Sequence, residues 1–264
     1  MSTPPVKLIK DFNFGVNLSS SEDDEYLIFI LKMSANDNRF NPEFCDSLNS
    51  ALDFIINEEI PKHLGQKYSL IVTGAGRFFS NGLDLKYLLS TPSPNQFLIK
   101  HYEPLIYKFL TLGIPTIALV NGHAFAGGMC LALAQDYRLA YSEGKALLSM
   151  NELLIRASIP AGMLSILRAK LTSPQILRDC IYARRWTIPQ AHNDGIIDEL
   201  VNDNESELLN ETIKFAKSKA VENKFIKVLH SIKEETYREA SALLLDPKSD
   251  KLDPFRFALP RNKL

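Results

Sequence analysis

Two glycine-containing segments stand where backbone amides could meet a substrate. The stretch "FFSNGLDL" (78–85) places a turn at Asn81-Gly82 after an apolar run, and "GHAFAGG" (122–128) ends in glycines that open an apolar helix. Glycine permits close approach of the backbone, and the first amides of a helix lack partners within it. Singly, each cluster is more typical of a tight turn. Together they favour an oxyanion hole, in which two N–H groups stabilise charge that develops on a carbonyl oxygen.

Other reactive side chains near these segments fit structural roles better. His123 has no paired Asp or Cys, which is typical of a turn or core histidine. Cys130 lies in an apolar helix without an adjacent base, so packing is favoured over nucleophilic attack. Asp136 ends that helix and fits a cap or a turn. The pattern also lacks GxGxxG after the first strand and GK[ST], which argues against a nucleotide-phosphate loop.

The elements that must position these residues alternate between strands and helices. Apolar runs and helical spacing predict strands at 25–33, 68–76 and 114–122, two short extended pieces within 136–150, and helices at 41–60, 95–113, from 126, and around 163–171. Asn41 is the expected N-cap of the first helix and Pro42 its first residue. Residues 91–96 read as a loop. This alternation predicts an α/β fold with a largely parallel sheet.

From about residue 203 the sequence consists of long, charged, amphipathic segments with no strand expected between them. We therefore divide the chain into a core domain, residues 1–200, and a helical C-terminal region, residues 201–264. The apolar positions of that region fit either the core or a subunit interface, and they include Phe225, Val228, Leu229 and Ile232.

Composition narrows the class of protein. The chain has 264 residues with 30 basic and 31 acidic side chains, and no basic stripe that would suit nucleic acid. Its 3 cysteines show neither metal-ligand spacing nor a disulfide framework, so we expect a reducing compartment and no metal. The apolar runs are too short to span a membrane, and the first residues do not resemble a secretory signal. We expect a soluble, intracellular protein.

The last three residues, Asn262, Lys263 and Leu264, have the basic-then-Leu form of the peroxisomal address. A tail that ends in Leu by chance is the alternative.

Four segments together carry a resemblance to a known family, and they are "FFSNGLDL" at 78–85, "PTIALVNGHAFAGGMCLALAQDYRLA" at 115–140, "LSMNELLIRASIPAGMLSILRAKL" at 148–171 and "AHNDGIIDEL" at 191–200. In this order and spacing the chain resembles the crotonase, or enoyl-CoA hydratase/isomerase, superfamily, and within it most closely the peroxisomal Δ3,Δ2-enoyl-CoA isomerases. The resemblance covers residues 25–200. It implies a spiral core of ββα units and a C-terminal region that builds a homotrimer or a dimer of trimers. It also implies acyl-CoA substrates, with coenzyme A as part of the substrate and no separate cofactor.

The resemblance assigns the oxyanion hole to the backbone N–H groups of Leu83 and Gly127, and an acid/base role to Glu152. Apolar neighbours of Glu152 would raise the pKa of its carboxyl group and suit it to proton transfer. From the residues alone, an exposed Glu or one held by a helix N-terminus is equally possible. The family's hydratases have a second, water-activating glutamate where this chain has Cys130, so the resemblance implies isomerisation and argues against hydration.

The predicted reaction moves the double bond of a 3-enoyl-CoA into conjugation, giving trans-2-enoyl-CoA in the oxidation of unsaturated fatty acids. Lys86 is the candidate for binding coenzyme A, and Lys224 and Lys227 are further candidates, although a charge on an amphipathic helix is usually only solvated. Asp84 and Lys86 fit either a structural pairing or the lining of the coenzyme A entrance. Asp198 is predicted to be part of a structural turn.

One alternative function is a hydratase or dienoyl-CoA isomerase, for which Glu143, expected in a turn, is the nearest further carboxylate. The other alternative is a non-catalytic acyl-CoA-binding subunit.

Overall fold

The computed structural model describes residues 5–171, 173–201, 207–246, 248, 254, 255 and 257. The strands of its larger sheet are β1 (Val6–Asp11), β2 (Val16–Glu22), β3 (Tyr26–Met33), β4 (Lys67–Gly74), β6 (Thr116–Leu119), β8 (Tyr137–Tyr141), β11 (Glu199–Val201) and β12 (Val221–Glu222). Their order is β1-β2-β3-β4-β6-β8-β11, and β12 pairs with the start of β4. The run from β3 to β11 is parallel, whereas β1, β2 and β12 pair antiparallel.

A smaller sheet positions the candidate site. Its strands, in the order β10-β9-β7-β5, are β5 (Phe78–Ser80), β7 (His123–Phe125), β9 (Leu147–Ser149) and β10 (Trp186–Thr187). The strands β5, β7 and β9 are parallel to one another. Leu83, Gly127 and Glu152 each follow one of these three strands, at the carboxyl ends that share one edge of the sheet.

Helices connect the parallel strands, as parallel pairing requires. They are α1 (Pro42–Phe54), α2 (Ile60–Lys62), α3 (Leu85–Ser90), α4 (Pro94–Phe97), α5 (Glu103–Thr111), α6 (Gly127–Ala134), α7 (Ala161–Lys170), α8 (Pro174–Ile181), α9 (Ile188–Asn193), α10 (Leu208–Lys219), α11 (Asn223–Thr236) and α12 (Arg238–Leu245). Wider π-helical turns at residues 55–59 and 98–102 join α1 to α2 and α4 to α5. Short 3-10 helices span residues 36–38 and 152–155.

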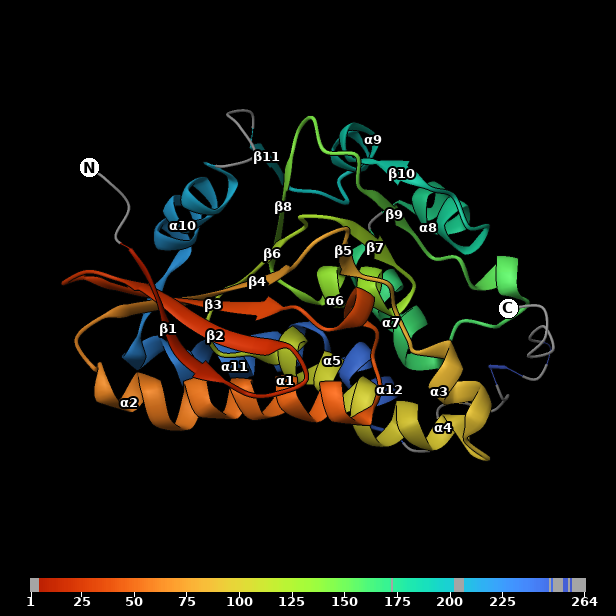
Figure 1. The fold of residues 1–264 in the computed structure, drawn as a ribbon, viewed down its shortest axis with the longest axis horizontal. Coiled ribbons are helices and arrows are strands. Elements are labelled where there is room, and N and C mark those ends of the chain that lie inside the picture. Colours follow the sequence, from red (N-terminus) through yellow and green to blue (C-terminus); the bar gives the residue numbers. More distant parts are fainter. Residues whose placement is uncertain are drawn as a thin grey trace.

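Both faces of the larger sheet are covered, as Figure 1 shows, with α1, α5 and α11 below the sheet and α10 above it. Successive side chains of β3 alternate between the two layers, as a strand requires. Leu27 and Phe29 join the main core with α1 and α5, whereas Ile28 and Ile30 pack towards α10. Because both layers are apolar, the central strands are buried along nearly their whole length.

The predicted α/β class with a largely parallel sheet is confirmed, and so is the start of the first helix. Asn41 caps α1 by accepting a hydrogen bond from the Phe44 N–H at 2.9 Å, and Pro42 is its first residue. The prediction of no strand between the C-terminal helical segments was wrong, because β12 lies between α10 and α11. The predicted loop at 91–96 ends early, since α4 already begins at Pro94. The hairpin of β1 and β2 was not predicted, because nearly all side chains of β1 are exposed and the strand therefore lacks an apolar run.

The C-terminal helices share the cores of the rest of the chain. Ala240 and Leu244 of α12 belong to the main core, and Ile213 of α10 belongs to the layer on the other side of the sheet. The division of the chain at residue 200 stays a prediction from sequence character.

Candidate active site

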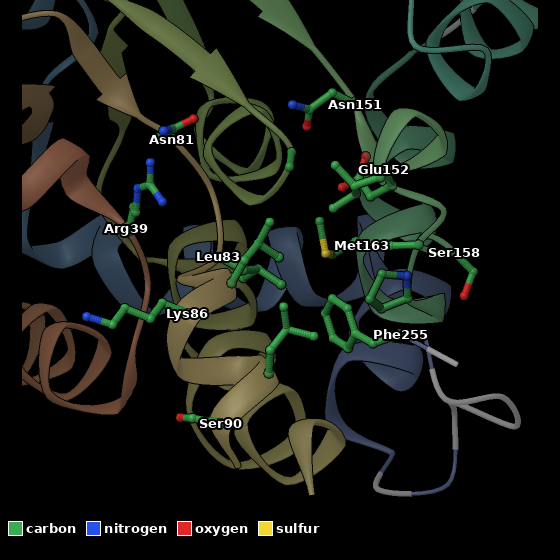
Figure 2. Close-up of a pocket in the computed structure, with 16 residues that line it drawn as sticks. Arg39, Asn81, Leu83, Lys86, Ser90, Asn151, Glu152, Ser158, Met163 and Phe255 are labelled. Atoms are coloured by element: carbon green, nitrogen blue, oxygen red, sulfur yellow. The ribbon is translucent and has the colours of Figure 1, made fainter. Parts of the chain in front are cut away.

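A cavity of about 650 Å³ opens beside the carboxyl ends of β5, β7 and β9. Figure 2 shows Leu83 on one side, with Glu152 and Met163 across from it and Phe255 near the other end. The lining is apolar over much of its area, with a few polar groups set into it. A pocket of this kind is typical of a small-molecule site.

The segment that carries Leu83 leaves one amide free. On either side of Leu83, the Phe40 N–H donates to the Gly82 carbonyl at 2.9 Å, and the Asp84 N–H donates to the Phe40 carbonyl at 2.8 Å. The Leu83 N–H itself donates to no described residue. Gly82 has φ +77°, a conformation that suits glycine. The pairing with Phe40 therefore holds this turn while one donor remains available.

The second free amide belongs to Gly127, the first residue of α6. The residue before it, Ala126, lines the cavity and has φ 51° and ψ −120°, which is strained for a residue with a Cβ. Two backbone bonds hold this conformation: Ala126 donates to the Ser149 carbonyl at 2.8 Å and accepts from the Cys130 N–H at 3.1 Å. The Gly127 N–H has no acceptor among the described residues.

The two amide segments touch. A Cβ at Gly82 would lie 3.2 Å from the Gly127 nitrogen, and a Cβ at Gly127 would lie 3.2 Å from Cδ2 of Leu83. Glycine at both positions thus lets the backbones approach. Two unpaired donors on touching segments, beside a cavity, form an arrangement that can bind one oxygen.

Glu152 lines the cavity with a buried carboxyl group. It begins the short 3-10 helix after β9, and only 6% of its surface is exposed. Neither carboxylate oxygen makes a hydrogen bond to another described residue. Burial raises the pKa of Glu152 from 4.5 to about 7, against a smaller opposing effect of its own backbone N–H. A carboxyl group with this pKa can take and return a proton near neutral pH.

Glu152 is also the single carboxylate among the described residues that line the cavity. Glu143 lies exposed in the turn between β8 and β9 and borders a different pocket. Cys130 is fully buried, and its Sγ lies 3.9 Å from Sδ of Met150 and from the Met163 carbonyl oxygen. Burial raises the pKa of the Cys130 thiol well above its ordinary value, so the thiol stays neutral.

Comparison with known proteins agrees with this geometry. The family model described as enoyl-CoA hydratase/isomerase matches residues 27–249. The chain belongs to this family.

Relatives and solved structures in the enoyl-CoA hydratase/isomerase family show the same relationship. The peroxisomal enoyl-CoA delta isomerase 1 of Arabidopsis thaliana is 36% identical over 173 residues, which cover 65% of this chain and 70% of that protein. The peroxisomal enoyl-CoA delta isomerase 2 of the same plant is 28% identical over 225 residues, covering 82% and 91%. An enoyl-CoA hydratase structure from Mycobacterium ulcerans superposes with a TM-score of 0.72 at 24% identity, covering 86% and 94%. This superposition shows that the chain has the crotonase fold.

The lysines that the sequence predicts as candidates for binding coenzyme A separate into two groups by their position. Lys86 is exposed and lines the cavity. Asp84, two positions before it, caps α3 by accepting a hydrogen bond from the Tyr87 N–H at 3.2 Å. Lys224 and Lys227 lie on α11 and are not among the residues that line the cavity.

The remaining candidates have structural partners. His123 accepts a hydrogen bond from the Leu147 N–H at 3.0 Å, and burial lowers its pKa. Asp136 accepts from the Thr116 N–H at 2.8 Å and pairs with Lys233. Asp198 forms an ion pair with Arg138 at 2.6 Å. All three therefore support the fold outside the cavity.

The cavity also contains residues that the sequence analysis missed. Arg39 lines the wall near Leu83 and pairs with Asp37 at 3.1 Å, and Figure 2 shows it on that side. Asn151 directly precedes Glu152, so the motif around Glu152 was the signal that could have found it. Phe255 also lines the cavity, although it lies more than 80 positions after residue 171, where the motif that contains Glu152 ends. No local sequence pattern marks Phe255 as a cavity residue.

Within the described residues, no group of His, Cys, Asp and Glu side chains is arranged to hold a metal ion. The described helices also include none that is long and apolar enough to cross a membrane.

Proposed function

We propose that the protein is a Δ3,Δ2-enoyl-CoA isomerase that converts 3-enoyl-CoA to trans-2-enoyl-CoA in the oxidation of unsaturated fatty acids. The observation that carries this proposal is the isolation of Glu152. It is one desolvated carboxylate that lines the cavity with a pKa of about 7, beside two backbone amides that have no acceptor among the described residues. The names of the two Arabidopsis relatives, both enoyl-CoA delta isomerases, support the same reaction.

The reaction needs one base and a site for the thioester oxygen. The N–H groups of Leu83 and Gly127 donate to the carbonyl oxygen, and the Glu152 carboxylate removes a proton from C2. The C–H electron pair enters the conjugated system and gives a dienolate, whose negative oxygen the two amides stabilise. The Glu152 carboxylic acid then returns the proton to C4. The carbonyl reforms, and the double bond lies between C2 and C3.

Hydration of the double bond, the main alternative reaction, requires a group that activates water. The lining of the cavity offers no second carboxylate among the described residues, and Cys130 is buried and neutral. Glu143, the other candidate, borders a different pocket. These positions favour isomerisation over hydration.

Binding of the coenzyme A part is assigned to the basic side of the cavity. Lys86 is exposed at the cavity, and Arg39 lines the same side. Both can meet the phosphates of coenzyme A, and Arg39 adds a planar guanidinium that suits phosphate oxygens. Coenzyme A belongs to the substrate, and the mechanism uses no separate cofactor.

We assign the activity to peroxisomes and to a homotrimer or a dimer of trimers. The two Arabidopsis relatives are named as peroxisomal enzymes. Asn262, Lys263 and Leu264, the candidate targeting signal, lie outside the described residues. A subunit contact through α11 is supported by its exposed apolar side chains.

The test compares wild type with Glu152→Gln, which keeps the shape of the side chain but removes the base. Purified protein receives a 3-enoyl-CoA, and formation of the conjugated thioester is followed by absorbance. A parallel assay measures hydration of 2-enoyl-CoA. We expect conjugation without hydration in the wild type, loss of at least about a hundredfold in rate with Glu152→Gln, and retained acyl-CoA binding.

Glu143→Gln serves as the matched control and should keep the wild-type rate. Hydration by the wild type would contradict the proposal in favour of a hydratase. Binding without either reaction would leave the non-catalytic acyl-CoA-binding subunit. An unchanged rate with Glu152→Gln would remove this residue from the mechanism.

A further inference from the structure

We propose that Phe40 and Tyr102 act as a positioning pair that fixes one amide donor of the cavity relative to the other. The inference rests on the proposed function, because it assigns a purpose to the Leu83 and Gly127 amides. Neither side chain lines the cavity, so neither is a catalytic residue. Their effect on the reaction would pass through the backbone that they hold.

Tyr102 holds the first turn of α6. Its side chain is fully buried, and its Oη donates to the Gly127 carbonyl oxygen at 2.7 Å. A Cβ at Gly127 would lie 2.9 Å from this same Oη, so the absence of a side chain at 127 is what admits the phenol. Glycine has a wide range of backbone conformations, and a hydrogen bond to its carbonyl restricts that range. Burial raises the pKa of Tyr102 well above its ordinary value, so the phenol remains a donor.

Phe40 holds the other donor from both sides. Its N–H and its carbonyl oxygen bond to Gly82 and Asp84, the two neighbours of Leu83. Phe40 is fully buried, and its ring meets the Tyr102 ring edge-on at 5.0 Å between centroids. Edge-to-face packing of two buried aromatic rings is both favourable and directional.

A continuous path of contacts therefore joins the two donors. It runs from Leu83 through the backbone and ring of Phe40 to the ring and hydroxyl of Tyr102, and from there to Gly127. The donors also touch directly through Gly82 and Gly127, which are conformationally soft residues. The buried aromatic pair supplies the rigid part of the frame.

Small displacements of such donors have large effects on rate. Stabilisation of an oxyanion depends on donors about 3 Å from the oxygen, and a misplacement of about 1 Å can cost a hundredfold. Loss of one hydroxyl from the frame leaves both donors present but less well placed. We expect Tyr102→Phe to lower kcat by about tenfold and to change KM by less than about twofold, because substrate binding draws on the whole cavity.

The test uses Tyr102→Phe, with Tyr107→Phe as the matched control. Tyr107 lies on α5, its Oη donates to Glu234 at 2.6 Å, and it does not line the cavity. The second measurement is the absorbance of 2,4-hexadienoyl-CoA bound to each protein. Hydrogen bonds to the thioester oxygen polarise this conjugated group and shift its absorbance to longer wavelength, whether or not any reaction occurs.

We expect a smaller red shift in Tyr102→Phe than in wild type, at equal saturation, and a shift like wild type in Tyr107→Phe. Phe40→Leu, which keeps the backbone bonds of Phe40 and removes only the ring, should move kcat and the red shift in the same direction. This second variant covers the case in which Tyr102→Phe folds poorly, which melting temperatures will show.

The outcomes separate the inference from the function on which it rests. A wild-type protein that isomerises, with kcat and red shift unchanged in Tyr102→Phe and Phe40→Leu, would overturn the inference alone. A uniform fall in melting temperature and active fraction, with an unchanged red shift per bound ligand, would also overturn it. A wild-type protein without turnover, but with a red shift that Tyr102→Phe weakens, would contradict the proposed function and support the positioning pair.

Discussion

At the scale of single residues, the site depends on the surroundings of the Glu152 carboxylate, which is buried and has no hydrogen-bond partner among the other described residues. A buried carboxylate without hydrogen-bond partners among the described residues is costly to ionise, and this cost is what raises its pKa to about 7. The same desolvation that suits the group to its proposed role in proton transfer therefore lowers the stability of the folded chain. Function and stability oppose each other at this one position.

This opposition predicts a pH-dependent stability effect. The folded protein holds the Glu152 proton up to about pH 7, whereas the ordinary pKa is 4.5. Between these values the folded state binds more protons than the unfolded state, so stability falls as pH rises, and above about 7 the full penalty is present. Glu152→Gln should therefore stabilise the protein by about 3 kcal/mol at pH 8 and by little at pH 4.5. Urea unfolding at the two pH values measures this, and an equal effect at both would contradict the desolvation account.

Glu152, Leu83 and Gly127 could be nominated from the sequence because each lies after a strand, inside a continuous motif that resembles the family. Phe40 and Tyr102 gave no such signal, because an aromatic side chain that supports a site looks the same in sequence as one that fills the core. Arg39 was missed for a related reason. It lies at the cavity because the next residue, Phe40, pairs with the turn at Gly82, which is 43 positions after Arg39 in the sequence. Contacts between distant segments set these roles.

At the scale of elements, α11 is anchored to the body of the protein by a buried charge. Lys233, 6% exposed, donates to the Leu112 carbonyl at 2.8 Å and to Oδ2 of Asp136 at 2.6 Å. Asp136 stands between α6 and β8, so this bond ties a C-terminal helix to the sheet. A buried pair of this kind is costly to break from one side, because the remaining charge loses its partner.

Lys233→Met should lower the free energy of unfolding by about 3 kcal/mol or more. Lys227→Met, an exposed position on the same helix, is the matched control and should change it by less than about 0.5 kcal/mol. Both values come from urea unfolding followed by circular dichroism. Equal effects of the two substitutions would show that the bond to Asp136 does not anchor the helix.

The C-terminal segment supplies a wall of the cavity through Phe255. The Pro254 carbonyl accepts a hydrogen bond from the Ser158 N–H at 2.8 Å, which fastens this segment next to the turn after Glu152. In Figure 2 the Phe255 ring lies in the cavity near Met163. The ring thus takes space that an acyl chain could otherwise fill.

Phe255→Ala should shift the preference towards longer acyl chains. Each further methylene that enters the vacated space is worth about 0.8 kcal/mol, or about fourfold in relative kcat/KM. A series of 3-enoyl-CoA substrates of increasing length measures the shift. Phe257→Ala, at a position 60% exposed, should leave the profile as in wild type. An unchanged profile in both variants would place the acyl chain elsewhere.

The elements themselves were predictable to different degrees. The buried strands β3 and β4 and the capped helix α1 were found because apolar runs and the Asn41-Pro42 start are local signals. β12 was missed because two residues are too few to show alternation, and its pairing with β4 is set by the packing of α10 on the sheet. Short strands depend on their partners more than on their own sequence.

At the scale of the whole molecule, the outer face of α11 remains apolar and exposed. Phe225, Val228 and Ile232 are 47%, 56% and 55% exposed and follow helical spacing. Apolar groups gathered on one helix face are typical of an interaction surface. This is the face through which we propose that subunits associate.

Val228→Asp combined with Ile232→Asp should shift the protein to smaller species, because charge on this face would have to be buried on association. Light scattering after size-exclusion chromatography gives the mass, with Lys100→Asp, at an exposed position between α4 and α5, as the control. A mass unchanged by the double substitution would mean that subunits meet through another surface.

The two ends of the larger sheet bear on how the protein behaves at high concentration. The end strand β1 is largely exposed, carries Lys7 and Lys10, and has an irregular register between Leu8 and Lys10. The strand at the other end, β11, is short within the described part of the chain, Glu199–Val201. Lysines, register breaks and short length all discourage a neighbouring chain from adding a strand. Growth into cross-β fibrils from the folded state is thereby hindered at both edges. A crowded solution of this protein should instead form clusters held by helix surfaces, which can separate again on dilution.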